Sequence, residues 1–218
     1  MVIAIDGPAG SGKSTVAKIL AERLGFLYID TGAMYRALTL KALSQEIDLK
    51  DQEELLKLAR HTHIELKTAD NKLQVILDGE NVTHQIRTPQ VTNNIFYIAD
   101  NIEIRKIMVS LQRKMAEGKD VVLEGRDTTT VVFPDADIKI YLDADFKERA
   151  RRRLKDFLAK GLNLILEEVE EDLRDRDYKD KNRAVGNLKI APDAVYIDTT
   201  SMNVEEVVER IISIVDGK

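Results

Sequence analysis

The sequence contains no cysteine and no tryptophan, and the features that it lacks exclude several classes of protein. Without cysteine there can be no disulfide scaffold, no thiol nucleophile and no metal site with cysteine ligands. No hydrophobic run approaches the ~18 residues that a membrane-spanning helix requires. The apolar segment at residues 1–5 meets Asp6 and Gly7 too early to serve as a secretory signal. We therefore expect a cytoplasmic protein that does not associate with membranes.

Composition places the chain among ordinary globular proteins. Its 218 residues fit one domain with an insertion or two small domains, and 44% are hydrophobic and 33% charged. A net charge of −5 argues against a general nucleic-acid binder. Lysine and arginine are nevertheless concentrated at residues 147–153 and 174–183, which favours a compact anionic ligand. Each cluster is equally typical of a solvated helix face that carries ion pairs.

Strand and helix patterns alternate along most of the chain. Buried strands are predicted at residues 2–5, 27–29, 121–123, 138–142 and 194–197. A helix is predicted between the first strand and Gly25, and another helical stretch ends at about residue 59. Further helical patterns cover residues 33–43, 89–116, 145–160, 164–174 and 204–215. This alternation predicts a parallel sheet covered by helices on both faces.

Residues 62–85 follow a different pattern. Hydrophobic and polar side chains alternate at 64–66 and 73–77, and the pairs Asp70-Asn71 and Asp78-Gly79 mark turns. This period of two predicts an antiparallel hairpin or a small meander. Such an element is out of place in a series of alternating strands and helices, so we interpret the segment as part of an inserted lobe.

A phosphate-binding loop follows the first strand. Residues 7–14, Gly-Pro-Ala-Gly-Ser-Gly-Lys-Ser, match the pattern G-x-x-x-x-G-K-[ST] between a strand and a helix. Glycine lets the backbone turn its N–H groups toward an anion, and the helix N-terminus adds positive potential. Lys13 supplies a point charge for the β- and γ-phosphates, and the Ser14 hydroxyl can bind Mg²⁺. The chain is therefore expected to bind a nucleoside triphosphate.

The phosphate loop by itself fits a small-molecule kinase, a switch GTPase or an ATPase motor. The sequence has no Asn-Lys-x-Asp-like run for guanine recognition, and a motor would usually be larger. The many arginines after the strand at 138–142 suit a reaction in which two phosphate groups approach and their charge must be neutralised. These features favour a kinase.

A charged helix is predicted after the strand at 138–142. Asp145 and Glu148 have the spacing of a capping box, and Gly161 marks the end of the helix. Arg149 and Arg153 lie about one turn apart on this helix, so both could reach one nucleotide.

Four further segments carry a family resemblance. They are Tyr28-Ile-Asp-Thr-Gly-Ala-Met-Tyr-Arg36, Glu124-Gly-Arg-Asp127, Val131-Val-Phe-Pro-Asp-Ala136 and Arg174-Asp-Arg-Asp-Tyr-Lys-Asp-Lys-Asn-Arg183. Together with the phosphate loop, and in the same order along the chain, they resemble the bacterial-type cytidylate kinases. The resemblance implies transfer of the γ-phosphoryl group of ATP to CMP or dCMP, with Mg²⁺ as cofactor. We expect a monomer that has no nucleic-acid partner.

The resemblance also implies a fold. It is an α/β, three-layer P-loop NTPase fold with a parallel sheet, a helical lid and an inserted small antiparallel β lobe for the monophosphate. The core would comprise about 1–35, 119–148 and 184–218, the lobe about 36–118 with its β insertion at about 62–85, and the lid about 149–183.

The same resemblance assigns residues to the two substrates. The ATP site would comprise Gly7, Pro8, Ala9, Gly10, Ser11, Gly12, Lys13, Ser14 and Thr15, with Arg149 on the adenine and Arg153 on the phosphates. The CMP site would comprise Thr31, Arg36, Arg113, Arg126, Asp127, Arg176, Asp180 and Arg183. Lys13, Arg126, Arg153 and Arg176 would be catalytic, Ser14 would bind the metal, and Glu124 is placed to support it.

Within the CMP site the resemblance implies separate roles. Arg36, Arg183 and Arg176 would contact phosphate groups, and Arg126 the base or the phosphates. Arg113 and Asp127 would contact the cytosine, Thr31 the cytosine or the sugar, and Asp180 the sugar hydroxyls. From the residues alone, Arg36 and Arg113 are also explained as cations on helix surfaces, and Arg126 with Asp127 as an ion pair in a turn.

The chain departs from the family pattern at two places. The family commonly has glycine at position 129, where this chain has Thr129, so either the backbone angles there are ordinary or the loop is placed differently. Lys179 and Lys181 stand where relatives often carry arginine, and we expect both to be solvated.

Two alternative functions stay open: a kinase for another small acceptor, such as UMP, AMP or shikimate, and a non-catalytic nucleotide-binding module.

Overall fold

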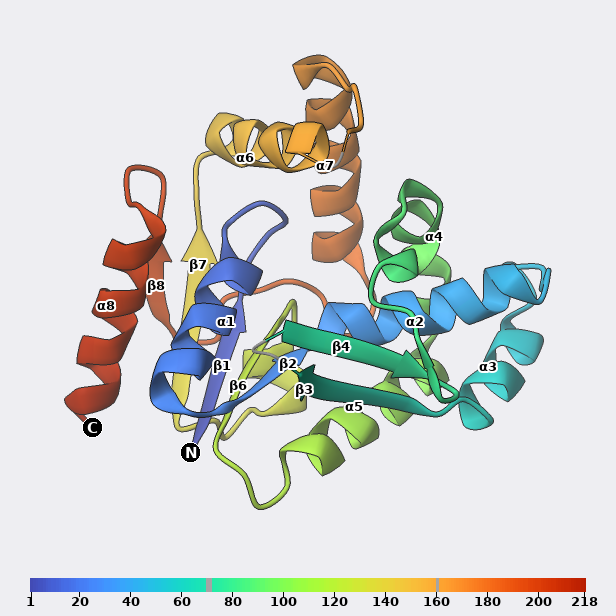
Figure 1. Ribbon diagram of the computed structural model, residues 1–218, viewed down its shortest axis with the longest axis horizontal. Helices are drawn as coiled ribbons and strands as arrows, with labels where there is room; N and C mark the ends of the chain where they lie inside the picture. The colour runs from blue at the N-terminus through green and yellow to red at the C-terminus, as the bar shows by residue number, and fades with distance from the viewer. Residues whose placement is uncertain (70–71, 160) are drawn as a thin grey trace. The chain divides into compact units, whose positions relative to one another are not determined.

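The chain forms two compact units in the computed structural model, which describes residues 1–69, 72–159 and 161–218 (Figure 1). One unit comprises Met1–Leu27 and Asp120–Lys218, and the other comprises Tyr28–Lys119. The chain passes from the first to the second inside strand β2 (Leu27–Asp30). Across the described residues, no helix combines the length and the hydrophobicity needed to cross a membrane.

The first unit is built on a parallel sheet. Its strands are β1 (Val2–Asp6), β6 (Val121–Gly125), β7 (Ile138–Asp143) and β8 (Val195–Asp198), in a five-stranded sheet with the order β2-β6-β1-β7-β8. Because β1 pairs in parallel with both β6 and β7, Ile3 lies opposite Val122 and Ile138. These strands are short apolar runs rich in β-branched residues, as expected for strands that are buried on both faces. The predicted parallel sheet is confirmed.

The helices of this unit are α1 (Lys13–Leu24), α6 (Phe146–Ala159), α7 (Leu166–Asn182) and α8 (Val204–Asp216). Helix α1 packs on β1 and β6 and against α8, and it buries Val16 and Leu20. Helices α6 and α7 pack against each other around Ala150 and Leu173. Each of these strands and α-helices begins within a few residues of its predicted position.

The carboxyl ends of the strands form one edge of the sheet. Asp6 ends β1 opposite Gly125 of β6, and Asp143 of β7 lies opposite Asp198 of β8. Segments that follow these strands therefore emerge at the same edge, where open α/β sheets bind their ligands. The phosphate loop at 7–14 is one of these segments.

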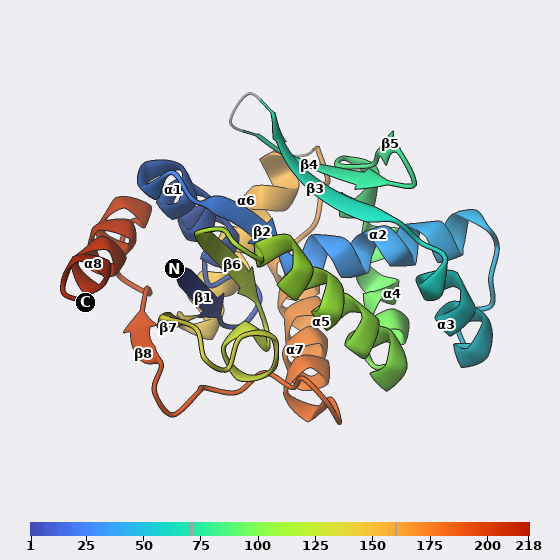
Figure 2. The same cartoon turned by 90° about the horizontal axis from the view of Figure 1, so that it is seen from below.

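The second unit consists of helices and a small antiparallel sheet (Figure 2). Its elements are α2 (Thr31–Ser44), α3 (Gln52–Arg60), β3 (Ile64–Ala69), β4 (Lys72–Leu77), β5 (Glu80–Asn81), the 3₁₀ turn η1 (Gln85–Arg87), α4 (Pro89–Ala99) and α5 (Ile102–Ala116). Strand β4 pairs antiparallel with both β3 and β5, which confirms the predicted antiparallel insertion. The predicted turn at Asp70-Asn71 lies outside the described residues. Buried side chains from α2, β4, α4 and α5 form the core of this unit, among them Leu38, Val75, Ile98 and Ile104.

The helical patterns predicted at 89–116 form two helices, and Asn101 caps the second, α5, by accepting a hydrogen bond from the Ile104 N–H at 3.0 Å. One helix prediction differs from the structure. Helix α7 was predicted to end at Arg174, and this is wrong, since the helix continues to Asn182. Ion pairs one turn apart, such as Lys179–Asp175 at 2.6 Å, support this polar extension, which has little hydrophobic periodicity.

The cap of α6 is only partly as predicted. Asp145 accepts hydrogen bonds from the N–H groups of Lys147 and Glu148, at 2.9 and 3.4 Å, so it is the N-cap. The Asp145 N–H, however, donates to the Thr200 hydroxyl at 2.8 Å instead of to Glu148. The reciprocal half of the predicted capping box is therefore absent, and the Glu148 carboxylate binds arginines instead.

A fully buried carboxylate ties β1 to the turn that follows β6. That turn is a single π-helical turn, η2 (Thr128–Val132), and it was not predicted. The backbone N–H and the hydroxyl of Thr128 both donate to one oxygen of Asp6, and those of Thr129 donate to the other, at 2.6 to 2.9 Å. Thr129 has no positive φ, so its backbone angles are ordinary and glycine is not needed there. Asp6 is therefore paired without a cation.

Replacing Thr129 with valine should destabilise the protein. Valine keeps the shape but removes the hydroxyl that donates to Asp6 at 2.6 Å, so a buried carboxylate oxygen loses one partner. We expect a loss of about 1–3 kcal/mol in the free energy of unfolding.

The matched control is Thr130→Val in the same turn. The Thr130 hydroxyl is buried and makes no hydrogen bond, so its removal should change the free energy of unfolding little. Urea unfolding of the two variants and the wild type measures the difference. Equal effects of the two substitutions would show that the contact with Asp6 contributes no stability.

Candidate active site

Backbone atoms of β7 and α6 lie very close to the phosphate loop. Gly7 has a φ of +151°, and a Cβ atom there would lie 1.9 Å from the Leu142 carbonyl oxygen of β7. Gly10 has a φ of +80°, and a Cβ atom there would lie 2.9 Å from the Arg149 carbonyl oxygen of α6. A side chain at either position would collide with backbone, so both glycines are required by the fold of the loop.

Lys13 lies inside the loop as a buried cation. Its side chain Nζ donates to the Pro8 carbonyl oxygen at 2.7 Å and approaches the Ser11 hydroxyl at 3.4 Å, and the residue is 5% exposed. Burial, reinforced by the nearby positive charge of Arg126, lowers the pKa of Lys13 from 10.5 to about 7. A phosphate group placed beside this nitrogen would favour the charged form, so the lysine is suited to an anionic ligand.

Ser14 and Glu124 bring two hard oxygen donors together. The Ser14 hydroxyl donates to Glu124 Oε1 at 2.6 Å, and Glu124 is a buried residue near the end of β6. Hydroxyl and carboxylate oxygens suit Mg²⁺, which keeps several waters and is commonly bound through substrate phosphates. Among the described residues, no cluster of three or more His, Cys, Asp or Glu side chains could hold a metal ion. The pair therefore fits a cation that arrives with a nucleotide.

Three charged side chains form a buried cluster between β6 and α7. Arg126 Nε donates to one oxygen of Asp180 at 2.6 Å, and Arg183 Nη2 donates to the other at 3.2 Å. Burial alone would raise the pKa of Asp180, but the charge and hydrogen bond of Arg126 keep it below its ordinary value. For the same reason the pKa of Arg126 is raised although the group is buried. Asp180 and Arg126 are thus both charged, and the positive charges of Arg176 and Arg183 also lower the pKa of Asp180.

The role predicted for Asp127 stays a prediction, and the structure describes only its surroundings. Asp127 is buried directly after Arg126, at the start of the turn that Asp6 anchors. Lys181 is exposed, as predicted, and Lys179 pairs with Asp175 at the surface of α7.

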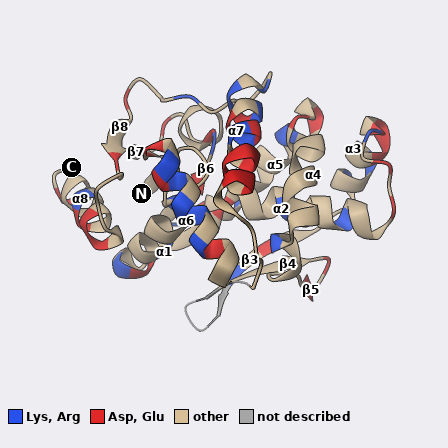
Figure 3. Ribbon diagram, turned by 90° about the horizontal axis from the view of Figure 1, so that it is seen from above, with Lys and Arg blue, Asp and Glu red and all other residues tan. Residues whose placement is uncertain are grey.

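Charged residues are concentrated on helices α6 and α7 of the first unit (Figure 3). Arg149 is buried, and its guanidinium donates to the Ala9 and Ala144 carbonyl oxygens, both at 3.1 Å, and pairs with Asp177 at 2.8 Å. Its polar atoms thus hold the phosphate loop to the two helices. Contact with an adenine, which the family resemblance implies, stays a prediction.

Arg153, one turn further along α6, is mostly buried as well. Its guanidinium lies over the Phe157 ring and is 3.4 Å from Asp172, and its Nε is buried without a hydrogen-bond partner. Burial lowers the pKa of Arg153. A buried guanidinium with an unused donor can accept a further anionic partner.

In the second unit, Asp30 organises the start of α2. Its side chain caps the helix by accepting from the Ala33 N–H at 2.7 Å, and it also accepts from Arg36 Nη2 at 3.0 Å. Arg87 approaches the same carboxylate to 3.8 Å. Thr31, the residue after Asp30, is buried. The structure therefore places Arg36 in an ion pair instead of on an open helix surface.

The prediction for α5 named Arg113, which is exposed in the last turn of the helix. The buried cation of this helix is Arg105, which lies 5.4 Å from the centre of the Tyr35 ring and donates to the Ala99 carbonyl oxygen at 3.0 Å. Buried positions of α5 recur every four residues from Ile104. This repeat could have been recognised in the sequence, and it places position 113 outside the buried face of the helix.

A family model and the curated relatives agree on one family. The family model described as "Cytidylate kinase" matches residues 3–217. A cytidylate kinase of Geobacillus kaustophilus is 52% identical over 216 residues, which is 99% of this chain and 96% of that protein. A cytidylate kinase of Desulforamulus reducens is 51% identical over 214 residues, which is 98% of this chain and 96% of that protein. A solved shikimate kinase of Bacteroides thetaiotaomicron shares the fold, with a TM-score of 0.50 at 13% identity, covering 99% of this chain and 98% of that one.

Replacing Lys13 with methionine should stabilise the folded protein in a pH-dependent way. Because burial lowers the pKa of Lys13 from 10.5 to about 7, the unfolded chain binds more protons than the native protein between these values. The wild type therefore loses stability, relative to Lys13→Met, as the pH falls from 10.5 to 7. We expect the variant to have a higher Tm at pH 7 and a gain that shrinks toward pH 10.

Thermal unfolding without nucleotide, followed from pH 7 to pH 10, checks this prediction. Lys18→Met is the control, since Lys18 is exposed on the same helix, and it should give no comparable gain. Parallel pH profiles for the wild type and Lys13→Met would contradict the effect of burial on Lys13.

Proposed function

Since the chain belongs to the cytidylate kinase family, we propose that it transfers the γ-phosphoryl group of ATP to CMP or dCMP, giving ADP and CDP or dCDP. The observation that carries this proposal is the combination, in one unit, of a phosphate loop around Lys13 with the buried cluster of Arg126, Asp180 and Arg183. A module that only binds a nucleotide needs the loop alone. A phosphotransferase must also neutralise a second phosphate group.

The loop would hold the donor. Backbone N–H groups of residues 7–15 and the N-terminus of α1 would surround the triphosphate, and Lys13 would contact the β- and γ-phosphates. Mg²⁺, bound with ATP, would be held by Ser14 with Glu124 beside it. Its positive charge would stabilise the developing charge on the transferred group. Arg149 and Arg153 are assigned to the donor as well, since Arg149 contacts the loop directly.

The arginine cluster would hold the acceptor. A phosphate oxygen of CMP is already a nucleophile, so the protein has to align it and neutralise charge, and no general base is needed. Arg126, Arg176 and Arg183 would contact the phosphates, with Asp127 and Asp180 on the nucleoside. Asp180 keeps two guanidinium groups fixed before substrate binds, which is preorganisation of the kind that phosphoryl transfer requires. The family resemblance assigns Thr31, Arg36 and Arg113 to CMP as well, and this assignment stays a prediction.

The proposal predicts a preference among acceptors. Steady-state rates of ADP formation with CMP, dCMP, UMP and AMP should show CMP or dCMP as the best substrate. A clear preference for AMP would overturn the acceptor assignment. No ADP formation with any of the four would instead favour a nucleotide-binding module.

Replacing Arg183 with alanine should impair the reaction and spare ATP binding. The buried guanidinium of Arg183 donates to Asp180 at 3.2 Å, so it is fixed beside the expected acceptor phosphate. We expect kcat/KM for CMP to fall by about 30-fold to several thousand-fold, which corresponds to ~2–5 kcal/mol of transition-state stabilisation.

The control for this variant is Arg174→Ala. Arg174 is exposed on the same helix and pairs with Glu170 at 2.8 Å, so its loss should leave kcat/KM nearly unchanged. Calorimetric titration with ATP measures whether donor binding survives in both variants. Normal turnover of CMP by Arg183→Ala would remove Arg183 from the site.

A further inference from the structure

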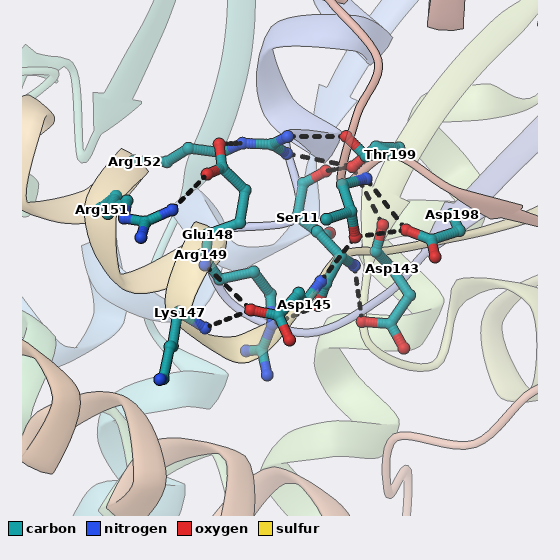
Figure 4. A network of polar contacts seen from close by, with 12 residues as sticks. Ser11, Asp143, Asp145, Lys147, Glu148, Arg149, Arg151, Arg152, Asp198 and Thr199 are labelled. Carbon is teal, nitrogen blue, oxygen red and sulfur yellow. Dashed lines mark hydrogen bonds and ion pairs between the residues drawn. The ribbon is translucent and has the colours of Figure 1, made fainter.

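Thr199, directly after β8, lies against the phosphate loop (Figure 4). The residue is 2% exposed. Its hydroxyl lies 3.3 Å from the Ser11 carbonyl oxygen and 2.9 Å from the Asp143 carbonyl oxygen, and its N–H donates to Asp143 at 2.8 Å. One residue therefore contacts the phosphate loop and fixes the ends of β7 and β8 to each other.

Arg152 of α6 holds Thr199 in this place. Its Nη1 donates to the Thr199 hydroxyl at 3.0 Å and its Nη2 to the Thr199 carbonyl oxygen at 2.7 Å. Its Nε donates to Glu148 at 2.9 Å, which sets the plane of the guanidinium (Figure 4). All three nitrogens of the planar Arg152 guanidinium donate hydrogen bonds at once, and a lysine could not supply this geometry.

The same guanidinium borders the loop itself. A Cβ atom on Gly12 would lie 4.0 Å from Arg152 Nη1, so the end of the side chain is beside the residue that precedes Lys13. Arg152 thus lies next to the last turn of the phosphate loop and holds the residue that contacts Ser11. Neither the phosphate-loop motif nor the family resemblance singled out Arg152 or Thr199.

We propose that Arg152 is a positioning residue for the donor nucleotide, acting through Thr199 to fix the Ser11–Gly12 segment of the phosphate loop. This inference rests on the proposed function, because it assigns a role in binding ATP. Backbone N–H groups grip a triphosphate only when the loop is already in the binding conformation, since ordering it on binding would cost affinity. Loss of Arg152 should therefore weaken ATP binding and leave the arginine cluster at Asp180 intact.

The test compares Arg152→Met with Arg151→Met. Arg151 is the adjacent residue on the same helix, but its side chain is 67% exposed and its one ion pair, with Glu148, is at 3.6 Å. We expect Arg152→Met to raise KM for ATP about tenfold with KM for CMP nearly unchanged, and Arg151→Met to change both less than about twofold. A structural role alone would not separate the two KM values in this way.

Two further variants keep the inference falsifiable if Arg152→Met folds poorly. Thr199→Val removes the hydroxyl and keeps the shape, so it should also raise KM for ATP selectively. In the double variant the two effects should not add, because each substitution breaks the same contact. Arg152→Lys should behave like Arg152→Met, since one point charge cannot replace the fork.

Titration with ATP in the absence of acceptor separates this inference from the proposed function. If the wild type binds ATP and Arg152→Met binds it about tenfold more weakly, the inference stands even when CMP is not phosphorylated. Equal ATP affinities for Arg152→Met and Arg151→Met would overturn it. An equal rise in KM for ATP and CMP would overturn it as well, because it would show a general loss of structure.

Discussion

The burial of positive charge at the carboxyl edge of the parallel sheet is the constraint on which the first unit depends. Arg126, Arg149 and Arg183 are largely withdrawn from water, and each is paired with a carboxylate of α7. An unpaired buried charge would cost several kcal/mol, so the aspartates of this helix are needed for the fold itself. Lys13 has no direct carboxylate partner among the described contacts, and its pKa is correspondingly lowered to about 7.

These pairs also keep the cluster attractive to anions. Asp180 accepts hydrogen bonds from two arginines, so these three groups hold two positive charges and one negative charge. Under the proposed function, an acceptor phosphate would meet guanidinium groups that their contacts with Asp180 already hold in place. An electrostatic contact with a buried charge is stronger than the same contact in water, and groups that are already fixed need to move little when it forms.

The sequence predicted those parts of the molecule that depend on local pattern. The phosphate loop was predicted because Gly7, Gly12 and Lys13 have the spacing of a short local motif. The antiparallel insertion was predicted because its side chains alternate with a period of two. The second half of α7 was missed because ion pairs and tertiary contacts support it and hydrophobic periodicity does not. The hydrogen bonds from Thr129 to Asp6 join residues far apart in the sequence, so no local pattern could indicate them.

Three separate segments of the first unit contact the phosphate loop or the end of the strand before it. At its beginning, Asp6 is anchored to the turn after β6 by Thr128 and Thr129. In the middle, Ala9 accepts a hydrogen bond from Arg149 of α6. At its end, Ser11 contacts Thr199, which Arg152 holds. Each contact involves a charged side chain, namely Asp6, Arg149 or Arg152. Contacts that already order a loop in the folded protein lower the cost of ordering it when a ligand binds.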